Sequence, residues 1–220
     1  MNEVVIRPLR FTADVPAMRA FLETLGLRSR IESERGGWVD MVAGRGMVAL
    51  HDSAASSTGG RSGETRLAFE ADDVDELKER FDAAGYEGAT VFDEAFGRVF
   101  SVVGPENTVI WVDERSKDLY GYKLHDAQPD PRWEVTPRLS VGDQAAWLQF
   151  LELLGGDNAD LVRFGPPAAE LEVRLEFGTT EALAEVAQRL TAAGCQPEQV
   201  DAGLTIIDPD GQTVRVHGES

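Results

Sequence analysis

The order of apolar and polar residues predicts a strand that leads into an amphipathic helix near the N-terminus. Residues 14–26 (DVPAMRAFLETLG) repeat apolar side chains at the spacing of one helix face, namely Met18, Phe21, Leu22 and Leu25. Asp14 stands where an N-cap belongs, and Gly26 where a left-handed C-cap belongs. The run VVIRPLRFTA before this helix has the character of a strand.

The same pattern returns further along the chain. Residues 73–85 (DVDELKERFDAAG) again begin with Asp-Val and end in Gly, after the strand-like run TRLAFEAD. Three strand-like segments follow each helix, so each repeat is a βαβββ unit. The two units span residues 1–52 and 63–115, and the Ser- and Gly-rich segment 53–64 is predicted to be a flexible linker.

Two further repeats follow after a polar segment. Residues 136–155 align with residues 7–26 without a gap, and residues 174–194 resemble residues 66–85. The third unit is short, with room for one strand at ADLVRF (159–164). We therefore predict an α+β fold of four tandem units forming mixed, cupped sheets. Its parts are a complete domain at 1–115, a linker at 116–132 and a degenerate domain at 133–220.

Paired βαβββ units with the motifs DV…LG, RLAFEADDVD and GPENTVIWVDE closely resemble the vicinal oxygen chelate superfamily. This superfamily includes glyoxalase I, extradiol dioxygenases and bleomycin-resistance proteins. The resemblance implies a metal site with a His or Gln on the first strand of each unit and a Glu on the last strand. In this chain the corresponding positions hold Arg7, Arg66, Ala49 and Trp111.

These four residues do not suit a metal ion. Ligation needs a lone pair, and a guanidinium is always protonated and has no acceptor atom. Two arginines at the positions of two ligands would also repel a divalent cation. We therefore expect neither a metal nor any other cofactor, and the metal-dependent activities of the superfamily are in doubt.

Strand alternation predicts which side chains line the pocket of the first domain. They combine aromatic rings with cationic groups, so the expected ligand-binding residues are Arg7, Phe11, Trp38, His51, Arg66, Arg98, Phe100 and Trp111. Arg7 and Arg66 would grip a planar anion through bidentate hydrogen bonds. In the alternative interpretation both arginines form internal salt bridges, to Glu70, Asp40 or Asp113, and fill a defunct site.

Composition restricts the partners. The 220 residues carry a formal charge of −18, which makes nucleic acid and anionic membranes poor partners. The single cysteine, Cys195, excludes an intrachain disulfide, and no apolar run reaches the length of a membrane span. The sequence accordingly predicts a cytoplasmic monomer or homodimer whose partner is a small-molecule ligand.

The predicted fold and pocket residues favour two functions. The first is a metal-independent protein of the glyoxalase and bleomycin-resistance type that binds an aromatic or acidic molecule in the first domain. The alternative is a glyoxalase-like lyase, isomerase or hydrolase in which His51 or Glu70 moves the proton and arginines replace the metal. A third reading has the pocket filled by the chain's own side chains.

Overall fold

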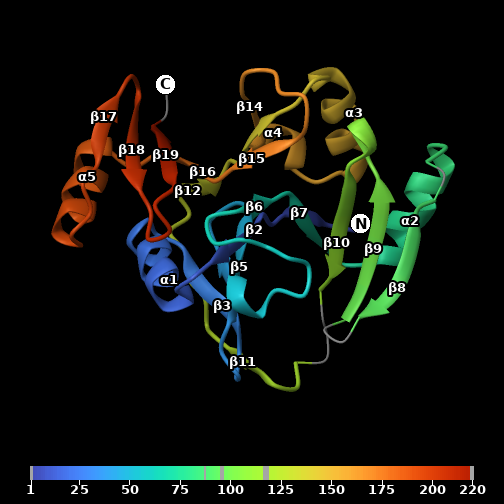
Figure 1. The fold of residues 1–220 in the computed structure, drawn as a ribbon, viewed down its shortest axis with the longest axis horizontal. Helices are drawn as coiled ribbons and strands as arrows, with labels where there is room; N and C mark the ends of the chain where they lie inside the picture. Colours follow the sequence, from blue (N-terminus) through green and yellow to red (C-terminus); the bar gives the residue numbers. More distant parts are fainter. Residues whose placement is uncertain (1, 87, 95–96, 116–118, 219–220) are drawn as a thin grey trace. The chain divides into compact units, whose positions relative to one another are not determined.

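The computed structural model describes residues 2–86, 88–94, 97–115 and 119–218. Each of the first two repeats contains a helix preceded by a short strand and followed by strands, as the hydrophobic pattern predicts (Figure 1). The chain is divided into two compact units, each assembled from three separate segments. None of the helices in the described part of the chain is long and apolar enough to cross a membrane.

The first compact unit comprises Met1–Arg7, Leu67–Leu119 and Arg138–Val173. Its five-stranded sheet has the order β1 (Val4–Ile6), β7 (Ala68–Ala71), β10 (Val109–Glu114), β9 (Gly97–Val103) and β8 (Thr90–Glu94). A three-stranded sheet has the order β14 (Arg163–Phe164), β13 (Arg138–Ser140) and β15 (Glu172–Arg174), the last strand ending at the boundary of the unit. The helices are α2 (Val74–Ala83), α3 (Gln144–Leu154) and α4 (Asn158–Leu161), with a 3-10 turn at Pro105–Asn107.

The second compact unit comprises Pro8–Arg66, Tyr120–Pro137 and Arg174–Ser220. Its six-stranded sheet has the order β11 (Tyr122–Leu124), β3 (Arg28–Ser33), β4 (Trp38–Val42), β5 (Met47–Asp52), β2 (Leu9–Thr12) and β6 (Thr65–Arg66). Its five-stranded sheet has the order β12 (Trp133–Val135), β16 (Glu176–Thr179), β19 (Thr213–Gly218), β18 (Gly203–Ile207) and β17 (Glu198–Val200). The helices are α1 (Val15–Thr24) and α5 (Leu183–Ala192), with a 3-10 turn at Ser53–Ala55.

Side-chain caps start the first two helices where the sequence predicts them. Asp14 accepts a hydrogen bond from the backbone N–H of Ala17 at 2.9 Å, and Asp73 accepts from Asp75 and Glu76. Gly26 and Gly85 follow the helices with φ of 102° and 82°. Gly26 also admits the Trp133 ring, because a Cβ there would lie 2.8 Å from Trp133 Cδ1.

Each compact unit has its own hydrophobic core, and each core joins repeats that are distant in the sequence. The core of the first unit includes Phe69 and Phe81 of the second repeat together with Trp147 and Phe150 of the third. The core of the second unit includes residues of α1 and of α5 with its sheet, from the first and fourth repeats. The compact units therefore cut across the predicted boundaries at 1–115 and 133–220.

Three segments differ from their predictions. Residues 159–164 are expected to be one strand, but they begin within α4 and end as the two-residue strand β14. The helix is favoured because Leu161 is buried in the core and Asn158 Nδ2 donates hydrogen bonds to the carbonyls of Val4 and Gly155. The linker 116–132 contains the strand β11, which pairs with β3; residues 116–118 of this prediction lie outside the described residues. The segment 53–64 is tied to β2 by hydrogen bonds between Phe11, Gly63 and Glu64.

Candidate functional site

The predicted pocket residues lie in two groups, one on each compact unit. On the first unit, Arg7 follows β1, and its buried guanidinium forms an ion pair with Asp113 of β10. Glu70 of β7 lies 3.8 Å from Arg7 Nη1 and accepts a hydrogen bond from Arg115 Nε at 2.9 Å. Arg7 is therefore held by carboxylates of its own sheet, which is the arrangement that the alternative interpretation predicted for it.

Trp111 shares the face of Glu70 and Asp113, because β10 runs beside β7 with Trp111 opposite Ala68 and Asp113 opposite Glu70. Trp111 is 37% exposed, and Phe92 of β8 contacts its ring edge to face at a centroid distance of 5.8 Å. This face of the sheet therefore presents an accessible aromatic pair next to the ion-paired Arg7. Phe92 is a member of this face that the sequence-based list does not include.

Arg98 and Phe100 lie on the other face, so the prediction that they line the pocket with Trp111 is wrong. Phe100 is fully buried against Phe81 of α2, at a centroid distance of 5.2 Å. Arg98 donates two hydrogen bonds of 2.8 Å to Asp75 at the start of α2, and these hold the pKa of the Asp75 carboxyl below its usual range. The prediction fails because the even-numbered residues of β9, which include Arg98 and Phe100, face α2.

On the second unit, four of the predicted residues share one face of the six-stranded sheet. Phe11 pairs with His51 across β2 and β5, Trp38 pairs with His51 across β4 and β5, and Leu9, on the same face as Phe11, pairs with Arg66. The Phe11 and His51 rings lie 5.7 Å apart, and the Arg66 guanidinium lies over the Phe11 ring at 4.8 Å. Strand alternation thus places these four side chains on one face, and their role in ligand binding stays a prediction.

Arg66 is partly exposed and held by neighbours from its own segment. Its Nε donates to Glu64 at 2.6 Å, and its Nη1 donates to Thr58 Oγ1 at 3.0 Å. Burial alone would raise the pKa of Glu64, but hydrogen bonds from Arg61 and Arg66, together with their charges, hold it below the usual range. Glu64 stands two residues before Arg66, so strand alternation was a signal that could have identified this partner.

The backbone of segment 53–64 covers Phe11. Phe11 is 1% exposed, and a Cβ added to Gly60 would overlap its ring at 2.3 Å. A ligand on this face would therefore meet Arg66, His51 and Trp38 rather than the Phe11 ring itself. Trp38 is supported by Tyr122 of β11, whose ring lies 5.7 Å away.

His51 has a defined tautomer. Its Nδ1 lies 2.7 Å from the carbonyl oxygen of Asp52, and because a carbonyl only accepts, Nδ1 carries the proton and donates. In the neutral ring, Nε2 is then the basic nitrogen. The neighbouring Asp40 is fully buried and accepts a hydrogen bond from Arg30 Nη2 at 2.7 Å.

The residues at the metal positions of the superfamily do not fit a metal ion. Arg7 and Arg66 offer only donors, Ala49 has no polar group, and the indole of Trp111 has only a donor. Among the described residues, no group of three or more His, Cys, Asp or Glu side chains is placed to hold a metal. At these four positions the side chains therefore offer hydrogen-bond donors or no polar atom, and no lone pair suited to a metal ion.

No family model and no curated protein matches the sequence. Solved structures do resemble it. A catechol 2,3-dioxygenase matches at 12% identity over 98% of this chain and 92% of that chain, with a TM-score of 0.61. The Mn(II)-bound glyoxalase from Novosphingobium aromaticivorans matches at 17% identity over 98% and 82%, with a TM-score of 0.58.

Homoprotocatechuate 2,3-dioxygenase from Arthrobacter globiformis matches at 16% identity, over 99% of this chain and 80% of that chain, with a TM-score of 0.60. Identities this low show the fold alone. The chain has the fold of the vicinal oxygen chelate superfamily along nearly its whole length, as the repeats predict, and its structural neighbours include dioxygenases and a glyoxalase. What it binds or catalyses has to be argued from its own residues.

Proposed function

We propose that this protein is a metal-independent small-molecule-binding protein whose ligand is an aromatic acid. The observation that carries the proposal is the Arg66 guanidinium, which is part of a 38% exposed side chain and lies over Phe11, the cross-strand neighbour of His51. Its hydrogen bonds to Glu64 and Thr58 use only part of its N–H donors. The remaining donors suit a carboxylate, and the indole of Trp38 suits an organic ring.

Arg7 has a supporting role in this proposal. Its side chain is only 6% exposed, and two carboxylates of its own sheet neutralise it. The Arg7 guanidinium compensates the negative charges of Glu70 and Asp113 rather than offering its N–H groups to an incoming anion. Ligand recognition is therefore assigned to Arg66, and Arg7 maintains the fold at the equivalent point of the other repeat.

Binding of 2-naphthoate tests the proposal. Isothermal titration of the EDTA-treated protein is expected to show binding that added Mn²⁺ or Fe²⁺ does not strengthen. Arg66→Ala is expected to weaken this binding about tenfold, the effect of losing one charge-assisted contact. Arg35→Ala, which removes an exposed arginine from the turn between β3 and β4, is the matched control and should leave binding unchanged.

Two results would contradict the proposal. One is equal affinity of the Arg66→Ala and Arg35→Ala variants for naphthoate. The other is stoichiometric metal in the protein as purified, with binding lost on chelation. Either result would mean that the arginine face is not the ligand site.

A second candidate function rests on the tautomer of His51. With Nδ1 bound to a carbonyl, Nε2 can take a proton from an enolisable substrate while Arg66 stabilises the developing anion. Glu70, the other predicted acid–base group, is 3% exposed between Arg7 and Arg115, which disfavours it in this role. Turnover of enolisable carbonyl substrates by the chelated protein, abolished in His51→Ala, would favour the enzyme over the binding protein.

A further inference from the structure

A cavity of about 700 Å³ lies in the second compact unit, away from the arginine face. One wall is the outer side of α1, and the opposite wall is formed by the turn after α5 and the end of β18. The residues that matter below are Ala20, Phe21, Cys195, Gln196, Glu198 and Thr205. Its volume falls within the range of small-molecule pockets, about 300–1,000 Å³.

The internal repeat shows why this space is empty. The segment LTAAGC (190–195), which begins in the last turn of α5, matches FDAAGY (81–86), which begins in the last turn of α2, so Cys195 stands at the position of Tyr86. The glycines before these two residues have similar φ values, 87° at Gly194 and 82° at Gly85. The two turns therefore present the next side chain in the same way, but one side chain is a thiol and the other a phenol ring.

In the first compact unit the Tyr86 ring fills the equivalent space. It packs against Phe150 of α3 at a centroid distance of 5.9 Å and against Phe81 of α2 at 5.1 Å. Phe150 corresponds to Phe21 in the gap-free alignment of the two repeats, and Phe21 lines the cavity together with Cys195. The second unit thus keeps the aromatic floor and lacks the aromatic ring that covers it.

We infer that this cavity binds a small neutral aromatic molecule, whose ring takes the place that Tyr86 occupies in the other unit. The ring would stack or pack edge to face on Phe21, as Tyr86 does on Phe150. The cavity is larger than one ring, so it has room for a two-ring ligand. This inference is independent of the function proposed for the arginine face.

The polar lining restricts the ligand further. The side chains of Gln196, Glu198 and Thr205 have no hydrogen-bond or ion-pair partner within the described ranges. Glu198 repels an anion, and the net charge of −18 adds to this repulsion. A hydroxyl group on the ligand can donate to the Glu198 carboxylate or the Gln196 amide, so the expected class is a phenol or naphthol rather than an aromatic acid.

The single cysteine provides a direct test in the wild-type protein. We expect 2-naphthol to slow the alkylation of Cys195 by iodoacetamide, because a ring above Phe21 would cover the thiol. The reaction is followed at about pH 8, since only the thiolate reacts and burial raises the pKa of this thiol. An alkylation rate unchanged by saturating 2-naphthol would overturn the inference.

Two substitutions of Cys195 distinguish the effect of the free space in the cavity from the effect of the thiol group. Cys195→Tyr restores the residue of the other repeat and is expected to weaken 2-naphthol binding by at least about tenfold in isothermal titration. Cys195→Ser removes the thiol but keeps the space, so its affinity should stay within about twofold of wild type. Equal affinity of the Tyr and Ser variants would contradict the inference, and the alkylation experiment decides the matter should the Tyr variant fail to fold.

The same ligand pair distinguishes this site from the arginine face. Arg66→Ala should weaken binding of 2-naphthoate and leave 2-naphthol unaffected, whereas Cys195→Tyr should have the opposite effect. If 2-naphthoate fails to bind at all, the proposed function fails while the cavity inference stands. If both probes respond to Arg66→Ala and neither responds to Cys195→Tyr, the cavity is not a ligand site.

Discussion

Arg7 and Arg66 occupy equivalent points of two repeats but differ in burial and in partners. Arg7 is buried and neutralised by carboxylates from two neighbouring strands, whereas Arg66 is partly exposed and rests on an aromatic ring. Sequence alone predicts that both positions lack a metal ligand, since that follows from residue type. It cannot distinguish an anion-binding arginine from a structural one, because burial and partners come from segments far away in the chain.

The burial of Arg7 predicts a large effect on stability. Arg7→Ala leaves Glu70 and Asp113 without this compensating charge, and breaking a buried ion pair in this way costs about 3 kcal/mol in the free energy of unfolding. Urea denaturation measures the loss. Arg163→Ala, which removes an exposed arginine from β14 of the same compact unit, is the control and should change the free energy by less than about 0.5 kcal/mol. Similar values for the two variants would contradict the structural role of Arg7.

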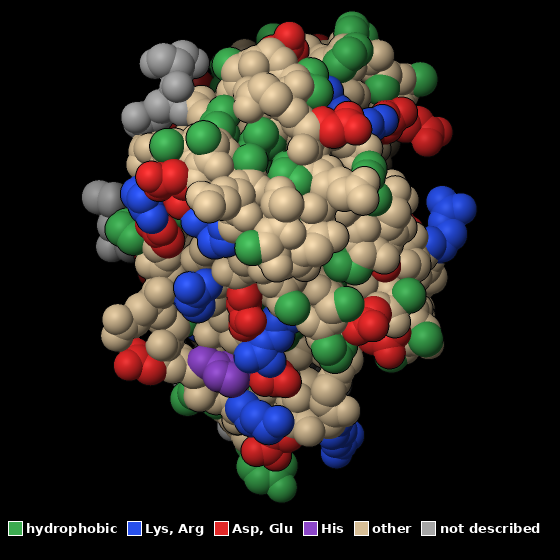
Figure 2. All heavy atoms as spheres, turned by 90° about the vertical axis from the view of Figure 1, so that its left-hand side faces the viewer, with side chains coloured by type: hydrophobic (Ala, Val, Ile, Leu, Met, Phe, Trp, Pro, Cys, Tyr) green, Lys and Arg blue, Asp and Glu red, His purple; other side chains and the backbone are tan. Residues whose placement is uncertain are grey.

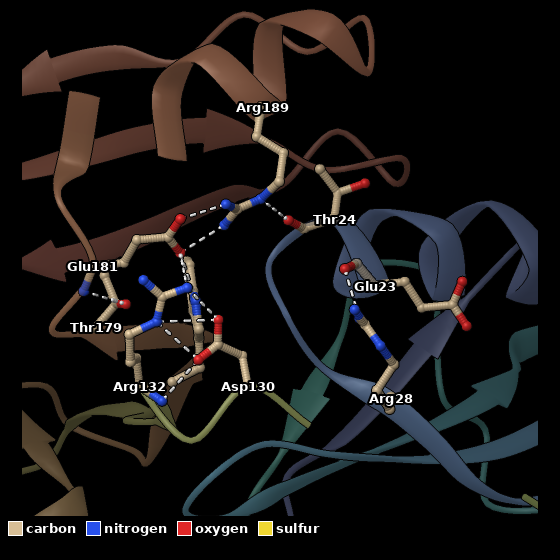
Figure 3. A network of polar contacts seen from close by, with 9 residues as sticks. Glu23, Thr24, Arg28, Asp130, Arg132, Thr179, Glu181 and Arg189 are labelled. Atoms are coloured by element: carbon tan, nitrogen blue, oxygen red, sulfur yellow. Dashed lines mark hydrogen bonds and ion pairs between the residues drawn. The ribbon is translucent and has the colours of Figure 1, made fainter. Parts of the chain in front are cut away.

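At the scale of elements, the two compact units use the same contact between helices. Arg189 of α5 donates its Nε–H to the carbonyl of Thr24 at the end of α1, at 2.7 Å (Figure 3). Arg80 of α2 donates to the carbonyls of Leu153 and Leu154 at the end of α3, at 3.4 and 2.8 Å. Thr24 and Leu153 are equivalent in the repeat alignment, as are Arg189 and Arg80. A cation therefore satisfies the free carbonyls of a neighbouring helix C-terminus in both units.

The Arg80 contact predicts a measurable contribution to stability. Arg80→Gln removes the charged guanidinium that donates to the two carbonyls of α3 and is expected to lower the free energy of unfolding by about 1 kcal/mol. Lys78→Gln on the same helix removes only an exposed pair with Asp82 and should cost about 0.5 kcal/mol or less. The two variants are compared by thermal denaturation. An equal effect would mean that the helix-end contact contributes nothing beyond a surface ion pair.

Glu181 links the Arg189 contact to the pH dependence of stability. Hydrogen bonds from Arg189 outweigh burial and, with one from Trp133 Nε1, hold the pKa of the Glu181 carboxyl below its usual range (Figure 3). A carboxyl whose pKa is lower in the folded chain adds stability above its unfolded pKa, about 4.3, and this is lost as pH falls through the folded value.

The expected result is that Glu181→Gln lowers the free energy of unfolding by about 2 kcal/mol near neutral pH. The difference from wild type should shrink as the pH falls below about 4, where the wild-type carboxyl is protonated as well. Urea denaturation across this pH range measures it. Glu185→Gln, an exposed carboxyl in the first turn of α5, is the control and should show no such trend. A constant difference between Glu181→Gln and wild type at all pH values would contradict the assigned role.

The predictions of helices and strands are correct where a local sequence pattern determines the structure. They are wrong where packing against distant segments determines it. The caps at Asp14 and Asp73 could be predicted because an N-cap needs only a side-chain oxygen at the right spacing. The predicted orientation of β9 is wrong because both of its faces carry apolar residues. Alternation alone therefore does not show which face α2 covers. Residues 159–164 also have mixed signals, and the contacts of Asn158 and Leu161 favour the helix α4.

At the scale of the whole molecule, the two hydrophobic cores do not follow the predicted division into a first and a second domain. Each compact unit combines one repeat from the first half of the chain with one from the second half. The core of the first unit contains α3 residues such as Trp147 and Phe150, and that of the second contains Phe177 and Leu190. Both cores are therefore incomplete in either half of the chain.

This arrangement predicts the behaviour of fragments. Residues 1–115, the predicted first domain, are expected not to unfold cooperatively alone and to bind the dye ANS, because the apolar faces of α1 and α2 lose their partners. Co-expression with residues 116–220 should restore a complex with the melting behaviour of the intact chain. Cooperative unfolding of the isolated fragment, with a sharp transition in circular dichroism, would contradict the assignment of the two cores.

The net charge of −18 does not produce one uniform acidic surface. On the face shown in Figure 2, positive and negative side chains lie next to one another in the lower half of the view. Arg19 pairs with Glu23, and His125 Nε2 lies 3.0 Å from a Glu32 carboxylate oxygen, so basic groups adjoin some of the acidic ones. The overall charge predicts repulsion of polyanions at long range, but it does not predict the chemistry of an individual site.

The sequence by itself determined the repeat unit, the fold and the absence of metal ligands at the expected positions, because these depend on spacing and on residue type. The tertiary structure decided which repeats share a core, which arginine is buried, which face of β9 is covered, and where a cysteine in place of a tyrosine leaves a cavity. These features depend on contacts between residues far apart in the chain, and the local alternation of apolar and polar side chains carries no information about which distant surface each face will meet.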